Sequence, residues 1–166
     1  MSEPIDACLD RWHRHLEGNL AGGLDAILHP HCVFLSPIVF TPQEGREITK
    51  LYLTAAGATL AAGEPGSRPG DAPDGAPGVG PHAGAASGGA GTFRYTKEIR
   101  QGRYAMLEFE TEVDGKYANG VDIITCDDDG MITEFKVMMR PLQAINAVHA
   151  RMKAMLEQLA SAPTSS

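Results

Sequence analysis

Residues 93–140 decide the fold, and they read FRYTKEIRQGRYAMLEFETEVDGKYANGVDIITCDDDGMITEFKVMMR. Apolar and polar residues alternate along much of it, and Gly102, Gly115 and Gly130 interrupt the alternation. A period of two is typical of β-strands, and an Asp-Gly pair between two such runs is a strong hairpin signal. The pattern predicts four antiparallel strands, at 93–100, 104–113, 116–127 and 132–140.

The strand at 104–113 also predicts which side of the sheet is covered. One side carries Ala105, Leu107, Phe109, Thr111 and Val113, and the other carries Glu108, Glu110 and Glu112. An antiparallel sheet with one covered face shows this division. The glutamates are therefore expected to face water.

Residues before and after the strands predict helices and one further strand. Apolar residues recur every three to four positions over 5–16, and a second, shorter helix is expected around 24–28. A strand at 32–35 ends at Ser36-Pro37, and Thr41-Pro42-Gln43-Glu44 resembles a capping box that opens a helix at 42–61. After Pro141 a closing helix carries an apolar stripe made of Leu142, Ile145, Val148, Met152, Met155, Leu156 and Leu159.

Residues 63–91 differ from the rest in composition, with 10 Gly, 6 Ala and 5 Pro among 29 positions. Such a segment cannot bury enough apolar surface to offset the entropy of ordering it. The sequence therefore predicts one domain over 1–160, interrupted by a disordered insert at 63–91 and followed by a disordered tail at 161–166.

Charge and composition exclude several classes of partner. The chain has 14 basic and 21 acidic residues, a net charge of −7, which disfavours nucleic acid. It shows no apolar run of membrane-spanning length and no signal-like start, so a cytoplasmic location away from membranes is expected. Three widely spaced cysteines predict neither a disulfide framework nor a zinc site, and the group His29-Pro30-His31-Cys32 lacks ligand spacing, so no metal is expected.

Two segments resemble one known superfamily. HPHCVFLSPIVFTPQEGREITKLYL (29–53) is similar to its first strand and following helix, and ITCDDDGMITEFKVMMRP (124–141) is similar to its final hairpin. The superfamily is the nuclear transport factor 2-like one, which includes ketosteroid isomerases, SnoaL-like polyketide cyclases, limonene epoxide hydrolases and scytalone dehydratase. The resemblance implies an α+β cone, in which a curved antiparallel sheet wraps around N-terminal helices and a C-terminal helix follows.

The resemblance also implies where catalytic groups would lie. The position of a catalytic base falls on Ser36, which cannot abstract a proton from carbon, and the position of a tyrosine falls on Trp12. The position of a protonated aspartate falls on Asp122. Two interpretations of Asp122 stay open: an acid or hydrogen-bond donor to a ligand, or a structural anchor held by a partner such as the Trp12 N–H or a buried water. His13, beside Trp12, is a further candidate for proton transfer.

The resemblance directs the strand face that carries Asp122 into the cone, so alternation along the strands, with Trp12 and Tyr52 added from two helices, predicts the residues that line it. They are Trp12, Tyr52, Leu107, Phe109, Gly120, Ile124, Phe135, Val137 and Met139. This lining suits a hydrophobic small molecule, and Gly120 would leave space in the middle of its strand. Ordinary core packing is the competing interpretation for each residue.

The resemblance leaves two functions open. One is a SnoaL-like isomerase, cyclase, dehydratase or hydrolase that needs no cofactor and acts on a hydrophobic carbonyl or epoxide compound through Asp122. The other is a non-catalytic ligand-binding or interaction module. A homodimer is expected in either case, because the closing helix carries more apolar surface than a small monomer exposes.

Overall fold

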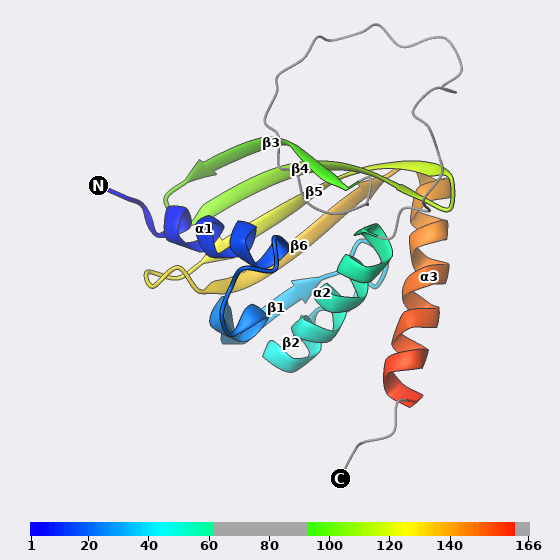
Figure 1. Ribbon diagram of the computed structural model, residues 1–166, viewed down its shortest axis with the longest axis horizontal. Helices are drawn as coiled ribbons and strands as arrows, with labels where there is room; N and C mark the ends of the chain where they lie inside the picture. Colours follow the sequence, from blue (N-terminus) through cyan, green and yellow to red (C-terminus); the bar gives the residue numbers. More distant parts are fainter. Residues whose placement is uncertain (62–92, 162–166) are drawn as a thin grey trace, which may run out of the picture.

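The computed structural model describes residues 1–61 and 93–161, which form three α-helices, one 3₁₀ helix and one six-stranded sheet (Figure 1). The sheet has the strand order β2-β1-β6-β5-β4-β3. The helices are α1 (Pro4–Leu16), η1 (Gly23–Ala26), α2 (Arg46–Ala61) and α3 (Leu142–Ser161). The strands are β1 (Leu28–Leu35), β2 (Gln43–Glu44), β3 (Arg94–Gln101), β4 (Tyr104–Val113), β5 (Lys116–Cys126) and β6 (Ile132–Arg140).

The four consecutive strands β3 to β6 form an antiparallel meander, as the alternation predicts. Each strand begins and ends within one residue of the predicted position. The turns between them use residues with positive φ, namely Gly102, Asp114, Gly115 and Gly130. The hairpin signals in the sequence were therefore sufficient to set this part of the topology.

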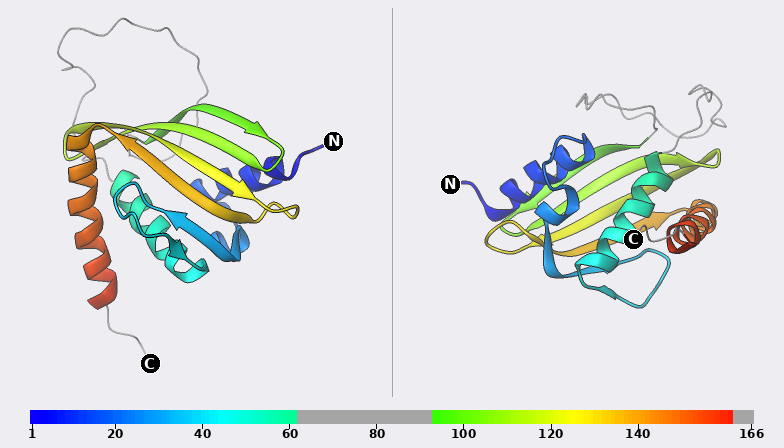
Figure 2. Two further views of the ribbon diagram at one scale, coloured as in Figure 1. Left: turned by 180° about the vertical axis from the view of Figure 1, so that it is seen from behind. Right: turned by 60° about the horizontal axis from the view of Figure 1, so that its bottom comes forward.

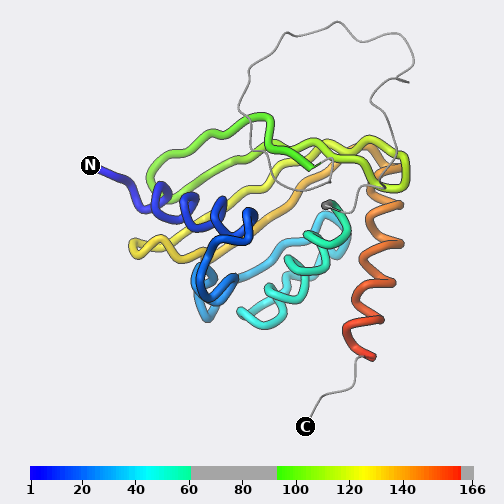
Figure 3. Tube along the Cα trace, viewed as in Figure 1, coloured from blue at the N-terminus to red at the C-terminus, as the bar shows by residue number. Residues whose placement is uncertain are grey.

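The sheet is mixed rather than wholly antiparallel, which corrects one detail of the expected fold. β1 runs parallel to β6, with Phe34 opposite Phe135, so a strand near the start of the chain pairs with one near its end. The trace of the chain shows this N-terminal block lying along the last strand of the meander (Figure 3). The overall α+β cone, curved and open at its edges, is confirmed.

Two predicted elements of the N-terminal block have different bounds in the structure. The second, shorter helix expected around 24–28 is the 3₁₀ helix η1, which ends at Ala26, and β1 starts already at Leu28. The helix expected from residue 42 begins at Arg46, because Gln43 and Glu44 pair with β1 as the edge strand β2. Gly45 separates the two with φ at 103°, and its N–H donates to the Cys32 carbonyl at 2.8 Å. Backbone pairing with β1 therefore overrode the capping-box pattern.

The helices cover only one face of the sheet (Figures 1 and 2). We call this concave face the inner face and the opposite one the outer face. α1 and α2 lie against the inner face, and α3 packs against α2 and the end of the meander. The main core lies between α1 and the inner face, where Leu9, Phe34, Leu107, Ile124 and Phe135 are buried. No helix in the described part of the chain is long and apolar enough to cross a membrane.

The predicted disordered segments, 63–91 and 161–166, lie outside the described residues except for Ser161, which ends α3. The prediction that 1–160 is a single domain around the insert stays a prediction. Within the described ranges, all strands belong to one sheet.

Candidate functional site

Asp122 lies on the inner face in the middle of β5. Its register partners are Leu107 on β4 and Val137 on β6, so apolar side chains flank it on both sides. Only 5% of Asp122 is exposed. A carboxyl in such surroundings requires a hydrogen-bond partner or a proton, because an isolated charge is costly to bury.

A chain of hydrogen bonds joins Asp122 to two aromatic residues. The Tyr95 hydroxyl donates to Oδ2 of Asp122 at 2.6 Å, and Nε1 of Trp12 donates to the Tyr95 oxygen at 3.0 Å. Trp12 comes from α1, Tyr95 from β3 and Asp122 from β5, so three elements meet here. Within the residues that the structure describes, Oδ1 of Asp122 has no hydrogen-bond partner.

Tyr95 reaches the inner face because β3 contains a bulge. Tyr95 pairs with Phe109 and Lys97 pairs with Glu108, so Thr96 is one extra residue between two consecutive partners on β4. Strict alternation would place Tyr95 on the same side as Lys97 and Ile99. A bulge changes the direction of a side chain in this way. Tyr95 was missed by the sequence analysis, and the only signal for it was an aromatic residue with a hydroxyl among charged neighbours.

The protonation of this group follows from its burial. Loss of water raises the pKa of Asp122 from 3.8 to about 7, although the hydrogen bond from Tyr95 acts to lower it. Burial, together with the nearby Asp122 charge, raises the pKa of Tyr95 well above its ordinary value. Tyr95 therefore stays a neutral donor, while Asp122 exchanges its proton near neutral pH. A carboxyl with such a pKa suits general acid–base chemistry.

The residues predicted to line a cavity are packed against one another in the structure. The Phe109 ring occupies the space over Gly120, so that glycine leaves no room for a ligand. Rings form a row from Trp12 through Phe135 and Phe34 to Tyr52, with centroid distances of 5.0, 6.3 and 5.3 Å. Leu107 and Ile124 are fully buried beside this row, and Val137 and Met139 are half-buried.

His13 lies at the surface rather than in the chain that contains Asp122. Its Nε2 is 3.0 Å from Oε2 of Glu98, and its ring meets the Tyr95 ring edge-on at 6.0 Å. Arg100 lies 3.6 Å from the same glutamate. The structure thus places His13 behind Tyr95 in a charged surface cluster, and its role in proton transfer stays a prediction.

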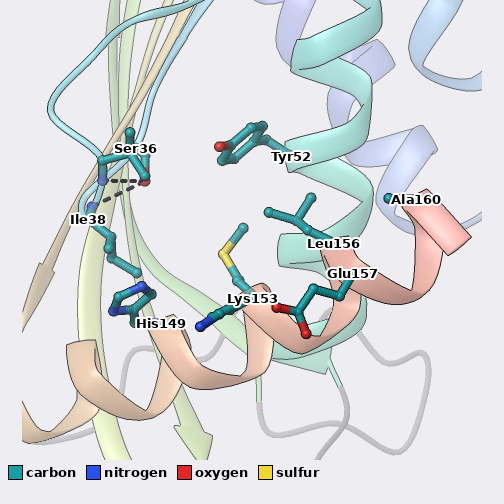
Figure 4. A pocket seen from close by; sticks show the side chains of 10 residues that line it. Ser36, Ile38, Tyr52, His149, Lys153, Leu156, Glu157 and Ala160 are labelled. Carbon is teal, nitrogen blue, oxygen red and sulfur yellow. Dashed lines mark hydrogen bonds between the residues drawn. The ribbon is translucent and has the colours of Figure 1, made fainter.

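A separate pocket of about 350 Å³ opens between α2, α3 and the segment after β1 (Figure 4). Its lining consists of Ser36, Ile38, Val39, Tyr52, His149, Met152, Lys153, Leu156, Glu157 and Ala160. Of the predicted lining residues, only Tyr52 contributes to it. Elsewhere in residues 1–61 and 93–161, no group of three or more His, Cys, Asp or Glu side chains is placed to hold a metal ion.

Comparison with solved structures identifies the fold family. A steroid delta-isomerase from Pseudomonas aeruginosa is 25% identical and superposes with a TM-score of 0.74, the match covering 98% of each chain. The chain has the nuclear transport factor 2-like fold. No protein-family model and no curated protein matches the sequence.

Two more distant structures share the nuclear transport factor 2-like fold. An NTF2-like protein of unknown function from Mesorhizobium loti is 14% identical, with a TM-score of 0.54 over 85% of this chain and 97% of that one. An epoxide hydrolase/cyclase-like enzyme with a role in pyran ring formation in polyether salinomycin is 13% identical, with a TM-score of 0.51 over 82% and 90%. At these identities the likeness concerns the fold alone.

In this nuclear transport factor 2-like chain, Ser36 occupies the position that the resemblance implies for a catalytic base. Oγ of Ser36 accepts hydrogen bonds from the backbone N–H groups of Ile38 and Val39, at 3.1 and 3.2 Å. Ser36 lines the separate pocket, and the aromatic row extends from that pocket toward Trp12 and Asp122. The site around Asp122 therefore offers an acid and a donor, and within residues 1–61 and 93–161 no side-chain base lies beside them.

Proposed function

We propose that this protein is a cofactor-independent enzyme that acts on a hydrophobic carbonyl compound through Asp122. The observation that carries the proposal is the buried Asp122, which accepts from Tyr95 at one oxygen and has no partner for the other oxygen among the described residues. A pKa of about 7 makes the protonated form available at neutral pH. The likeness to a steroid delta-isomerase agrees with a carbonyl compound as substrate.

In the proposed reaction, the proton on Oδ1 of Asp122 is donated to the carbonyl oxygen of the substrate. Water removes a proton from the carbon next to the carbonyl, the electron pair of that C–H bond forms a C=C bond, and the carbonyl π pair moves to oxygen. Tyr95 holds Oδ2 in place, and Trp12 holds Tyr95. A donor aimed at developing negative charge lowers the barrier to such a step.

A second candidate is a ligand-binding module without turnover. Two observations favour it: a serine occupies the position implied for a base, and Phe109 fills the space above Gly120. In this case Asp122, Tyr95 and Trp12 would order the interior of the cone. The two candidates differ in whether a bound carbonyl compound reacts.

Deuterium exchange tests the proposal directly. Androst-4-ene-3,17-dione is incubated in D₂O with the protein, and mass spectrometry follows the uptake of deuterium next to the carbonyl groups. We expect the wild type to accelerate uptake, and Asp122→Leu to slow it roughly 100-fold, the usual scale for losing one donor to an oxyanion. Asp10→Leu, which removes an exposed acid from α1, serves as the matched control.

Two outcomes of this experiment would contradict the proposed catalysis by Asp122. If the wild type binds the dione but exchanges no faster than buffer, the binding module is the correct function. If Asp122→Leu exchanges as fast as the wild type, Asp122 is not the acid.

We also propose that the protein forms a homodimer in the cytoplasm. Exposed apolar side chains gather on the outer face, where Ile99 pairs with Met106 and Met138 lies opposite Val121. Cys8, Cys32 and Cys126 are free and buried, which agrees with a reducing compartment.

A further inference from the structure

The pocket between α2 and α3 is distinct from the site at Asp122. Tyr52 forms its inner wall, and the Phe34 ring packs against Tyr52 at 5.3 Å. Phe135 follows Phe34 at 6.3 Å and leads to Trp12. The pocket and the hydrogen-bonded chain thus lie at opposite ends of a filled aromatic row, so a molecule could occupy the pocket without contacting Asp122.

The pocket has an apolar floor and one polar side. Ile38, Tyr52, Met152 and Leu156 provide the floor. His149, Lys153 and Glu157 follow one another at intervals of four residues, so they stand on one face of α3 in successive turns. Figure 4 shows these three side chains on the side of the pocket opposite Tyr52. A molecule with an apolar body and one polar end matches this division.

The polar side favours a negatively charged end group. In the described part of the chain Lys153 forms no ion pair, so its ammonium group can meet an anion at the mouth. His149 adds N–H donor capacity one turn away, and Glu157 is the one carboxylate of the lining. The Ser36 oxygen accepts two backbone N–H groups, which leaves its own O–H to donate. Donors therefore outnumber carboxylates around the opening.

We propose that this pocket is a binding site for a medium-chain aliphatic monocarboxylate. The alkyl chain lies against Ile38, Met152 and Leu156, and the carboxylate lies at Lys153 and His149. A volume of about 350 Å³ is at the lower end of the range for small-molecule pockets, about 300–1,000 Å³, and it suits a single flexible chain.

Calorimetric titration with two probes tests the site and the charge separately. Decanoate below its micelle concentration and 1-decanol share an alkyl chain but differ in charge. We expect the wild type to bind both, and Lys153→Gln to weaken decanoate at least fivefold while leaving 1-decanol unchanged. Lys116→Gln, an exposed lysine of β5 outside the pocket, is the matched control and should change neither.

Substitutions that fill the pocket with a larger side chain should weaken the binding of both ligands. Leu156→Trp is expected to weaken decanoate and 1-decanol at least tenfold, and Ala160→Trp, at an exposed lining position, repeats the test where folding is not at risk. Asp122→Leu should leave decanoate affinity within twofold of the wild type, so failure of the catalytic proposal would not affect this one. The inference is overturned if the wild type does not bind decanoate, if both tryptophan variants bind it normally, or if Lys153→Gln has no effect.

Discussion

At Asp122, burial and a hydrogen bond shift the pKa of the carboxyl group in opposite directions. Burial raises the pKa, the bond from Tyr95 lowers it, and burial prevails, because the value is about 7. The unfolded chain releases this proton near its ordinary pKa of 3.8. Between these values the folded protein holds a proton that the unfolded chain has lost, so stability depends on pH.

The sign of that dependence gives a prediction. A raised pKa contributes stability that is complete below pH 3.8 and is lost as the pH rises to about 7. At 1.36 kcal/mol per pH unit, we expect the wild type to lose roughly 2–3 kcal/mol between pH 5 and 7 relative to Asp122→Asn. Asparagine can still accept from Tyr95. Urea unfolding of both proteins at pH 5, 6, 7 and 8 measures the difference.

Infrared spectroscopy provides an independent readout of the same proton. The wild type at pH 5 should show the C=O band of a protonated carboxyl in an apolar environment, and Asp122→Asn should lack it. Parallel stability curves for the two proteins, with no such band, would show that Asp122 is an ionised anchor. The donor role would then be wrong.

Gly120 gives a second prediction at the scale of one residue. A Cβ at this position would lie 2.6 Å from the backbone oxygen of Met138 and closer still to the Phe109 ring. Gly120→Ala should therefore destabilise the protein by about 1–3 kcal/mol, as overpacking does. Gly57→Ala in α2 is the control, because nothing lies within 4 Å of its added Cβ. Thermal unfolding compares the two, and equal melting temperatures would mean that Phe109 moves aside freely.

These two residues show what the sequence could reveal about the site. Asp122 was found because its position relative to the Gly130 turn resembles a family pattern. Gly120 was predicted to leave space for a ligand. A glycine is equally needed where a neighbouring ring fills that space, as Phe109 does here. Tyr95 was not predicted, because its orientation depends on one extra residue in β3. The alternation of apolar and polar residues does not indicate where such a bulge occurs.

At the scale of elements, Arg11 ties α1 to the turn between β5 and β6. Nη2 of Arg11 donates to the carbonyl oxygens of Asp129 and Gly130, at 2.8 and 2.6 Å. These oxygens belong to the turn between β5 and β6. The contact fixes the helix that carries Trp12 against the strands that carry Asp122 and Phe135.

Removal of that contact gives a third prediction. Arg11→Ala should destabilise the fold by about 1.5–3 kcal/mol, the usual worth of hydrogen bonds from a charged group, and should increase solvent access to Trp12. Arg14→Ala, an exposed arginine of the same helix, should change stability by less than about 0.5 kcal/mol. Urea unfolding followed by Trp12 fluorescence measures both. Equal effects would mean that the Arg11 contact does not help to hold α1.

The elements that were predicted correctly are those determined by residues close to one another in the sequence. The strands of the meander follow from alternation and from turn residues a few positions apart. The start of α2 was wrong because Gln43 and Glu44 are drawn into pairing with β1, a contact between segments that local patterns do not join. The parallel pair of β1 and β6 is a further non-local contact of this kind.

For the whole molecule, the outer face is the surface through which we expect copies to associate. Apolar side chains on the closing helix suggested a dimer through α3, yet Ala147, Val148 and Met152 of that helix are buried within the chain itself. On the outer face, by contrast, Met138 is 55% exposed beside other apolar residues. The dimer is therefore expected to form through the sheet.

Paired substitutions distinguish the two surfaces and give a fourth prediction. Met138→Glu should shift the wild-type dimer to monomer at micromolar concentration, because it buries a charge in the interface. Leu142→Glu, at a position of α3 that is 70% exposed, should leave the dimer intact. Sedimentation velocity measures both. A monomeric wild type excludes the dimer, and a reversed pattern assigns the interface to α3.

The parallel pairing of β1 with β6 also constrains how the molecule is made. During synthesis β1 leaves the ribosome early, but its partner on that side, which contains Phe135, emerges about a hundred residues later. Until then β1 can pair only with the two-residue strand β2, and the apolar residues of α1 have no meander to pack against. Contacts so distant along the chain slow folding and prolong the exposure of apolar surface. Apolar surface of the nascent N-terminal third is therefore expected to stay exposed until β6 has been synthesised.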